Sequence, residues 1–301
     1  MILRDYQQEM MDRLEEAWTR HRSVMVQMPT GTGKTRLMAE VIRKTLPQPL
    51  LATHPQPLSG REGGGVLVVA HRRELVEQIR KSLPPTLPTT LPRPLSDSEG
   101  SDVQPLVVVE SIQKITRKDS PPAYLCERGK WKPSLIIVDE AHHAVAKTYR
   151  KLWEWWPEAK FLGLTATPCR LSGEAFTDLF DTLLQSWSIR TFIGKGWLSD
   201  LNYISVRSDS VALRKVAALN KRGADGDYQT KEMATVLDVP ESIEHLYRSY
   251  SHYADGKKGI VYAINREHAR HIADYYQKHG VRCAVIDAKT PAEERRRLVE
   301  A

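Results

Sequence analysis

Residues 28–35 combine glycines, threonines and one lysine in a pattern that suits phosphate binding: Met-Pro-Thr-Gly-Thr-Gly-Lys-Thr. Glycines let the backbone approach an anion closely because they carry no Cβ, and N–H groups at a loop-to-helix junction can bind that anion. Lys34 would supply positive charge to the β- and γ-phosphates of a nucleotide, and the hydroxyl of Thr35 is a ligand for Mg²⁺. The predicted nucleotide contacts in this loop are Thr30, Gly31, Thr32, Gly33, Lys34 and Thr35.

Two carboxylates follow the apolar run 135–138. Such a run is typical of a buried parallel strand. Asp139, at its end, would face the crevice where nucleotides bind and would hold Mg²⁺ through water. Glu140 would orient and deprotonate the attacking water. Each segment alone has a simpler interpretation, a Gly- and Thr-rich turn or a solvated strand end, but together they predict binding and hydrolysis of ATP.

The elements that must position these residues alternate along the chain. A helix is expected at 6–21, another at 34–45, and a third ending near Ser82. The expected strands are 24–28, 66–70, 106–109, 134–139, 160–166 and 203–206. This alternation predicts an α/β fold with parallel sheets and helices on both faces.

Further segments occur in an order that matches known motifs. They are Leu-Arg-Asp-Tyr-Gln at 3–7, Val-Ala-His-Arg-Arg-Glu-Leu at 69–75, Val-Glu-Ser-Ile-Gln at 109–113, Leu-Thr-Ala-Thr-Pro at 164–168 and Gly-Ile-Val-Tyr-Ala at 259–263. Together with the phosphate loop, which has Met28 where the general pattern has Gly, they resemble a superfamily 2 helicase of the DEAD/DEAH-box type. The form of the first motif, the doubled histidine at 142–143 and the stretch 188–190 are most similar to the RadD-like and type III restriction-subunit branch.

The resemblance implies a P-loop NTPase with RecA-like domains and gives roles to further residues. Gln7 would contact the adenine edge, with Arg4 of the same motif beside the nucleotide. His142 would join Lys34, Asp139 and Glu140 as a catalytic residue. The coupling of hydrolysis to movement would involve Thr165 and Thr167, near which His142 would make its contacts. Nucleic acid would be contacted by Arg72, Arg73, Ser111 and Gln113. For His142 and for the two arginines, a solvated position at a helix start is the alternative.

The resemblance also implies a domain organisation. A first RecA-like domain would span 1–206 and a connector 207–239, followed by a partial second RecA-like domain at 240–301. The second would contain a helix at 241–254 and strands at 259–263 and 281–287. The chain reaches Ala301 before motifs V and VI of the family are expected, so we expect it to bind ATP and hydrolyse it slowly.

Two irregular stretches, at about 46–65 and 83–105, interrupt the first domain. Ten of the 18 prolines lie between Pro47 and Pro105, and residues 55–63 match residues 92–100 at six of nine positions. We interpret both stretches as insertions in surface connections, which cost little closure entropy. A Pro-rich docking site for a partner is the alternative.

Composition limits the class of protein and its partners. The 301 residues carry a net charge of +7 and a pI of about 9.2, which favours a polyanionic partner. Within the helicase hypothesis, we expect this partner to be DNA more than RNA. The three cysteines have no metal-ligand spacing, and a reduced cytoplasmic environment is expected. No apolar run reaches membrane-spanning length and no signal peptide is evident, so we expect neither membrane insertion nor secretion.

Two further groups of residues lie outside these motifs. Trp153, Trp155 and Trp156 could stack on bases or pack a helix onto the sheet. The arginines at 295–297 fit a solvated helix face. The functional hypothesis is an ATP-dependent helicase or translocase, with the motor subunit of a restriction system, or a nucleic-acid-binding fragment with negligible turnover, as alternatives.

Overall fold

The computed structural model describes most of the chain outside the two Pro-rich stretches. The described residues are 2–46, 64–71, 73–83, 107–118, 120–122, 132–144, 147–168, 176–204, 228–300 and, between them, 214, 216, 218 and 219. Contacts divide the chain into two units, Met1–Leu201 and Asn202–Ala301. Each unit is described by itself. The predicted insertions lie almost wholly outside the described residues, as does Arg72.

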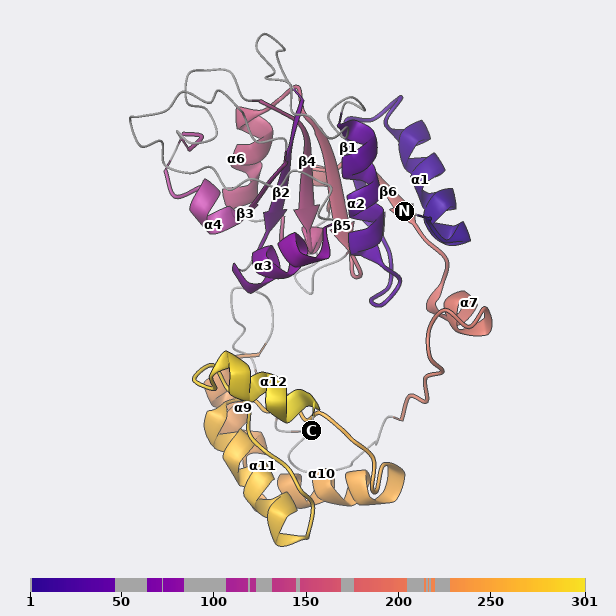
Figure 1. Ribbon diagram of the computed structural model, residues 1–301. Coiled ribbons are helices and arrows are strands. Elements are labelled where there is room, and N and C mark those ends of the chain that lie inside the picture. Colours follow the sequence, from indigo (N-terminus) through magenta and orange to yellow (C-terminus); the bar gives the residue numbers. More distant parts are fainter. Residues whose placement is uncertain are drawn as a thin grey trace. The chain divides into compact units, whose positions relative to one another are not determined.

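The first unit is built on a six-stranded sheet, with strand order β3-β2-β4-β5-β1-β6 (Figure 1). Every pairing in it is parallel. The strands are β1 (Ser23–Gln27), β2 (Gly65–Ala70), β3 (Val107–Ser111), β4 (Pro133–Asp139), β5 (Lys160–Thr165) and β6 (Thr182–Gln185). This confirms the expected α/β fold with a parallel sheet.

Helices cover both faces of this sheet, because parallel strands need crossover connections. The longer helices are α1 (Asp5–Ala17), α2 (Lys34–Thr45), α3 (Arg73–Ser82) and α6 (Lys147–Trp155). The shorter ones are α4 (Ile112–Ile115), η3 (Ala141–His143), η4 (Phe176–Asp178) and α7 (Ile189–Gly194).

Alternate residues along each strand belong to two separate hydrophobic cores. Val24 and Val26 of β1 join the core that contains side chains of α1, α2 and α3. Met25, between them, joins the core that contains α4, η3 and α6. The period of two that a strand imposes therefore separates the two helical layers.

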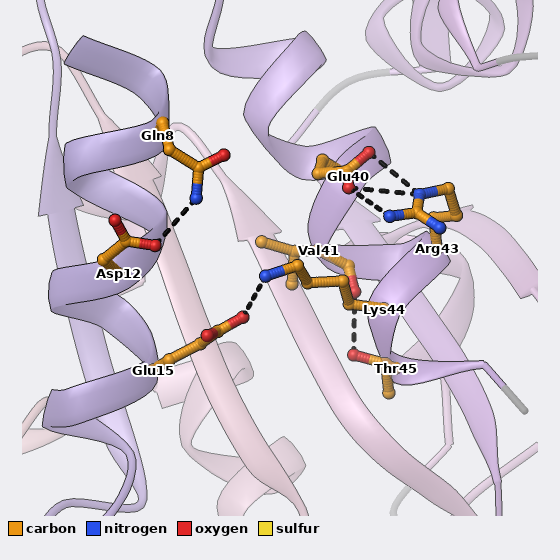
Figure 2. A network of polar contacts seen from close by, with 8 residues as sticks. All are labelled: Gln8, Asp12, Glu15, Glu40, Val41, Arg43, Lys44 and Thr45. Atoms are coloured by element: carbon orange, nitrogen blue, oxygen red, sulfur yellow. Dashed lines mark hydrogen bonds and ion pairs between the residues drawn. The ribbon is translucent and has the colours of Figure 1, made fainter. Parts of the chain in front are cut away.

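Polar contacts add to the apolar packing between α1 and α2 (Figure 2). Lys44 of α2 forms an ion pair with Glu15 of α1, with Nζ and Oε1 2.5 Å apart. Within α2, the Arg43 guanidinium donates to the largely buried Glu40, and this hydrogen bond lowers the pKa of that carboxyl. The ion pair joins two helices that both contribute to the predicted nucleotide site.

The tryptophans of α6 pack against the protein itself. The Trp153 ring stacks on Phe161 of β5 with centroids 4.0 Å apart, and its indole N–H donates to the hydroxyl of Ser23. Trp156 is buried. The structure therefore favours helix packing over base stacking for this cluster.

The second unit is described as helices around a small core. They are α9 (Thr230–Leu237), α10 (Pro240–Tyr253), α11 (Arg266–Lys278) and α12 (Ala292–Glu300). The core cluster contains Ile243, Ile272 and Tyr276. The helix expected at 241–254 is confirmed as α10, whereas α9 lies inside the stretch expected to be a connector.

The strand predictions at 259–263 and 281–287 are wrong: neither segment forms strand pairing with another described residue. Ile260 is 78% exposed and Tyr262 is 92% exposed. The resemblance implied these strands, but a strand exists only through its hydrogen-bonded neighbour, so a matching motif alone does not create one. Tyr203 and Ile204, from the strand expected at 203–206, are also irregular and exposed.

The arginines at 295–297 are exposed on α12, as predicted. Among the described segments, none of the helices combines the length and the apolar character of a membrane span.

Gly163 of β5 provides a packing test. A Cβ at this position would lie 2.6 Å from Cζ of Phe180 and 2.9 Å from Cβ of Ala141. We expect Gly163→Ala to lower the free energy of unfolding by about 1–3 kcal/mol in urea titrations, because both neighbours must move. Gly194→Ala is the control, since nothing lies within 4 Å of that Cβ position. Equal stability of both variants would contradict this account of the core.

Candidate nucleotide-binding site

The loop between β1 and α2 has two glycines in a backbone conformation that other residues rarely adopt. Gly31 and Gly33 have φ values of 85° and 82°, in the left-handed region that favours glycine. A Cβ on Gly33 would also lie only 2.6 Å from Nε2 of Gln7. The first turn of α2 contains no acidic residue, so its positive end is available to an anion.

Side chains from α1 hold this loop through one backbone carbonyl. The hydroxyl of Tyr6 donates to the carbonyl of Thr32 at 3.0 Å, and Nε2 of Gln7 donates to the same oxygen at 3.2 Å. The hydroxyl of Thr32 donates to the carbonyl of Pro29 at 2.7 Å. These contacts hold the conformation of the loop.

Gln7 is turned toward the loop and is only 1% exposed. Its Oε1 accepts a hydrogen bond from the backbone N–H of Arg4 at 3.1 Å, so both ends of the carboxamide have partners. The predicted contact of Gln7 with an adenine edge stays a prediction. In the described arrangement, Gln7 supports the phosphate loop.

Lys34 and Thr35 open α2 and are both partly exposed. Nζ of Lys34 lies 3.2 Å from the carbonyl oxygen of Met28, to which it donates. This hydrogen bond holds the ammonium group against the loop. A phosphate bound there would offer the same group a stronger, charged acceptor. Thr30 is exposed at the loop tip.

The carboxylates Asp139 and Glu140 lie at the end of β4, as predicted. In the sheet register Asp139 pairs with Leu164, and the next residue of β5, Thr165, pairs with Gln27 of β1. The ends of β4, β5 and β1 therefore meet at the sheet edge that carries the phosphate loop. Burial and the adjacent charge of Glu140 raise the pKa of Asp139, and Lys34 opposes this shift.

Glu140 has a strained backbone. Among the described residues, Glu140 is the non-glycine residue whose φ is positive, at 49°. A left-handed conformation costs roughly 1–2 kcal/mol in such a residue, and strain of this kind concentrates at functional sites. Here it ends β4 abruptly and leads into η3.

His142 connects Glu140 with the end of β5. Its Nδ1 lies 2.9 Å from Oγ1 of Thr165 and 3.4 Å from Oε2 of Glu140. The Thr165 hydroxyl donates to the carbonyl of Thr167 and accepts from the N–H of that residue, both at 3.1 Å. The contact that the resemblance implies between His142 and the 165–167 segment is present.

The residues predicted to contact nucleic acid are only partly described. Gln113 is exposed, and its Nε2 donates to the carbonyl of His71 at 2.7 Å, which joins the ends of β3 and β2. Ser111 is buried at the end of β3. Arg72 and the side chain of Arg73 lie outside the described residues. Arg117 and Lys118, which follow α4, are also exposed.

Residues 1–170 match the family described as type III restriction enzyme, res subunit, over more than half of the chain. The chain belongs to this family. The match agrees with the motifs that resemble those of a superfamily 2 helicase.

Two individual proteins are also similar to this chain. A 51.5 kDa protein of Lactococcus phage (isolate 7-9) is 28% identical over 275 residues, which cover 91% of this chain and 51% of that protein. The putative ATP-dependent helicase IRC3 of Saccharomyces cerevisiae is 25% identical over 176 residues, covering 56% of this chain and 25% of that protein. The chain thus spans about half, or less, of these relatives.

Solved helicase structures align at low similarity. The helicase domain of Pyrococcus furiosus Hef aligns with a TM-score of 0.45 and 18% identity, over 92% of this chain and 53% of that chain. The UvsW helicase of bacteriophage T4 aligns with a TM-score of 0.43 and 17% identity, over 62% and 60% of the two chains.

The raised pKa of Asp139 leads to a test of stability against pH. An unfolded chain ionises this carboxyl near 3.8, whereas the folded protein retains the proton to higher pH, so the buried charge reduces stability as pH rises through the folded pKa. We expect Asp139→Asn to raise the urea midpoint at neutral pH, and the gain to shrink as pH falls toward 4.

Asp12→Asn, on an exposed part of α1, is the control for the loss of one negative charge. A midpoint for Asp139→Asn that stays below that of the wild type at every pH would show that the carboxylate stabilises the free protein.

Proposed function

We propose that the chain is the ATP-dependent motor of a helicase or translocase that acts on nucleic acid, with DNA as the favoured substrate. The observation that supports this most is the hydrogen-bonded phosphate loop lying at the same sheet edge as Glu140, His142 and Thr165. Family membership supports the same proposal, as does the name of the yeast relative, a putative ATP-dependent helicase.

The phosphate loop would bind the triphosphate of ATP. Its N–H groups and the first turn of α2 would hold the phosphate oxygens, and Lys34 would exchange the Met28 carbonyl for the β- and γ-phosphates. Thr35 and Asp139 would hold Mg²⁺, which when bound neutralises charge on these phosphates. Both side chains offer oxygen atoms, the donors that Mg²⁺ prefers. Because Asp139 is largely buried, a metal ion held there would keep only part of its shell of water.

Glu140 would orient and deprotonate the attacking water. Its left-handed backbone and its 3.4 Å contact with His142 fix the carboxylate relative to β5. Because His142 also contacts Thr165, a shift of Glu140 on hydrolysis would reach the 165–167 segment through one imidazole. That segment would transmit the change toward bound nucleic acid.

A second proposal, the motor subunit of a restriction system, rests on the family to which the chain belongs. It differs in its outcome: with its nuclease partner supplied, ATP-dependent movement would end in DNA cleavage. The first proposal expects strand separation or translocation without cleavage.

We expect Lys34→Ala to abolish measurable ATP binding, because the triphosphate loses its main point charge. Glu140→Gln should bind ATP like the wild type and lose turnover. Titration with a fluorescent ATP analogue and a phosphate-release assay measure the two effects. Lys44→Ala, at the other end of the same helix, is the control and should bind normally. Wild-type affinity in Lys34→Ala would remove the assignment of the loop.

Binding of single-stranded DNA should be sequence-tolerant and steeply dependent on salt, since the predicted contacts are with phosphates. We expect the double variant Arg72→Ala, Arg73→Ala to reduce the slope of log K against log salt by about 1.4, if each arginine neutralises one phosphate of a single strand. The matched control is Arg296→Ala, Arg297→Ala, on the exposed face of α12. An unchanged slope in the first variant would exclude these arginines from the interface.

A further inference from the structure

An aromatic cluster encloses Tyr6 at the base of the phosphate loop. It consists of Tyr6 with Trp187, Phe192 and Trp197, whose ring centroids lie 5.5, 4.8 and 5.7 Å from that of Tyr6. Tyr6 belongs to α1, whereas the other three follow β6 and flank or belong to α7. The cluster therefore brings the segment 187–198 against the N-terminal motif.

Arg4 is held within this cluster by two contacts. Its Cζ lies 4.5 Å from the centroid of the Trp197 ring, and Nη1 donates to the hydroxyl of Tyr6 at 3.1 Å. That hydroxyl in turn donates to the carbonyl of Thr32. A continuous series of contacts thus runs from Trp197 through Arg4 and Tyr6 to the phosphate loop.

The second indole of the cluster contacts Tyr6 in a similar way but has different partners. Trp187 lies under Nζ of Lys195, 4.5 Å from its ring centroid, and its indole N–H donates to Glu9. An indole can therefore pack against Tyr6 without contacting an arginine. Trp197, which is 38% exposed, is the indole that contacts the cation of the N-terminal motif.

A guanidinium group is a planar cation with two faces, and it stacks well on aromatic rings. The contact with Trp197 limits the conformations that the long side chain of Arg4 can adopt. Tyr6 contacts the Thr30–Thr35 loop directly, and Arg4 is joined to the loop through Tyr6. We take the base of a nucleotide with its phosphates on this loop to lie beside Arg4, because the motif 3–7 is the one for which the resemblance implies the adenine contact.

We propose that Trp197 is a positioning residue for the base of the bound nucleotide. It holds the Arg4 guanidinium so that the opposite face stacks on the base, which makes the segment 187–198 part of the nucleotide site. The inference rests on the proposed function, because it takes the loop as the site of ATP. It predicts that Trp197 contributes to the binding of a nucleotide but not to the binding of a bare triphosphate.

The test compares two ligands, ATP and inorganic tripolyphosphate, on the full chain by isothermal titration calorimetry. Trp197→Ala should weaken ATP binding about fivefold, the size expected of a partly exposed cation–π contact, and leave tripolyphosphate binding unchanged. Trp197→Phe, which keeps an aromatic face, should recover most of the loss. Arg4→Ala should show the same selective loss, and adding Trp197→Ala to it should have little further effect.

Trp187→Ala is the matched control, because it removes an indole that also contacts Tyr6 but not Arg4. It should leave the ratio of the two affinities at the wild-type value. Equal weakening of both ligands by Trp197→Ala, or unchanged ATP binding, would overturn the inference while leaving the proposed function intact. Failure of the wild type to bind either ligand would overturn both, and thermal melting of each variant identifies any that do not fold.

Discussion

The carbonyl oxygen of Thr32 is the atom on which the predicted nucleotide site depends. It accepts hydrogen bonds from Tyr6 and Gln7, two neighbours on α1, and it lies between the two glycines whose left-handed backbone shapes the loop. A loop held in this way needs little reordering when an anion binds, so less conformational entropy is lost on binding. The sheet and helices of the first unit position this loop.

Parallel pairing supplies that support. Since β1, β5 and β4 are in register and all run in one direction, their carboxyl ends meet at one edge. The edge brings together the phosphate loop, the Asp139–Glu140 pair and the Thr165–Thr167 segment. The buried strands allow no register slip, because a shift by one residue would exchange the two cores and expose their apolar side chains.

Local patterns in the sequence predicted much of this arrangement. The helix expected at 34–45 has those bounds, and β4 extends only one residue beyond the strand expected at 134–139. Both segments combine a strong apolar pattern with a clear start or end signal. By contrast, β6 has four residues and no fully buried side chain, so its pairing with β1 has no local signature. The segments 259–263 and 281–287 are the opposite case, because the resemblance to a family implied strands there that have no described strand partner.

Long-range contacts within the site were also beyond the reach of local patterns. The motif 3–7 indicated a nucleotide contact for Gln7, but no periodicity places its carboxamide on the carbonyl of Thr32 or puts Trp197 beside Arg4. His142 is different, because its contact with Thr165 was implied by the resemblance to a family.

The cluster around Tyr6 has a consequence for how the protein is made. Its members come from opposite ends of the first unit, since Arg4 and Tyr6 lie near the start of the chain and Phe192 and Trp197 near the end of that unit. The N-terminus emerges first from the ribosome, so α1 has no contact with these partners until nearly the whole unit has been synthesised. Contacts of such high sequence separation form slowly. The packing around the loop would thus be among the last parts of the unit to be completed during synthesis, which leaves the nascent chain without a finished ATP site until its first unit is whole.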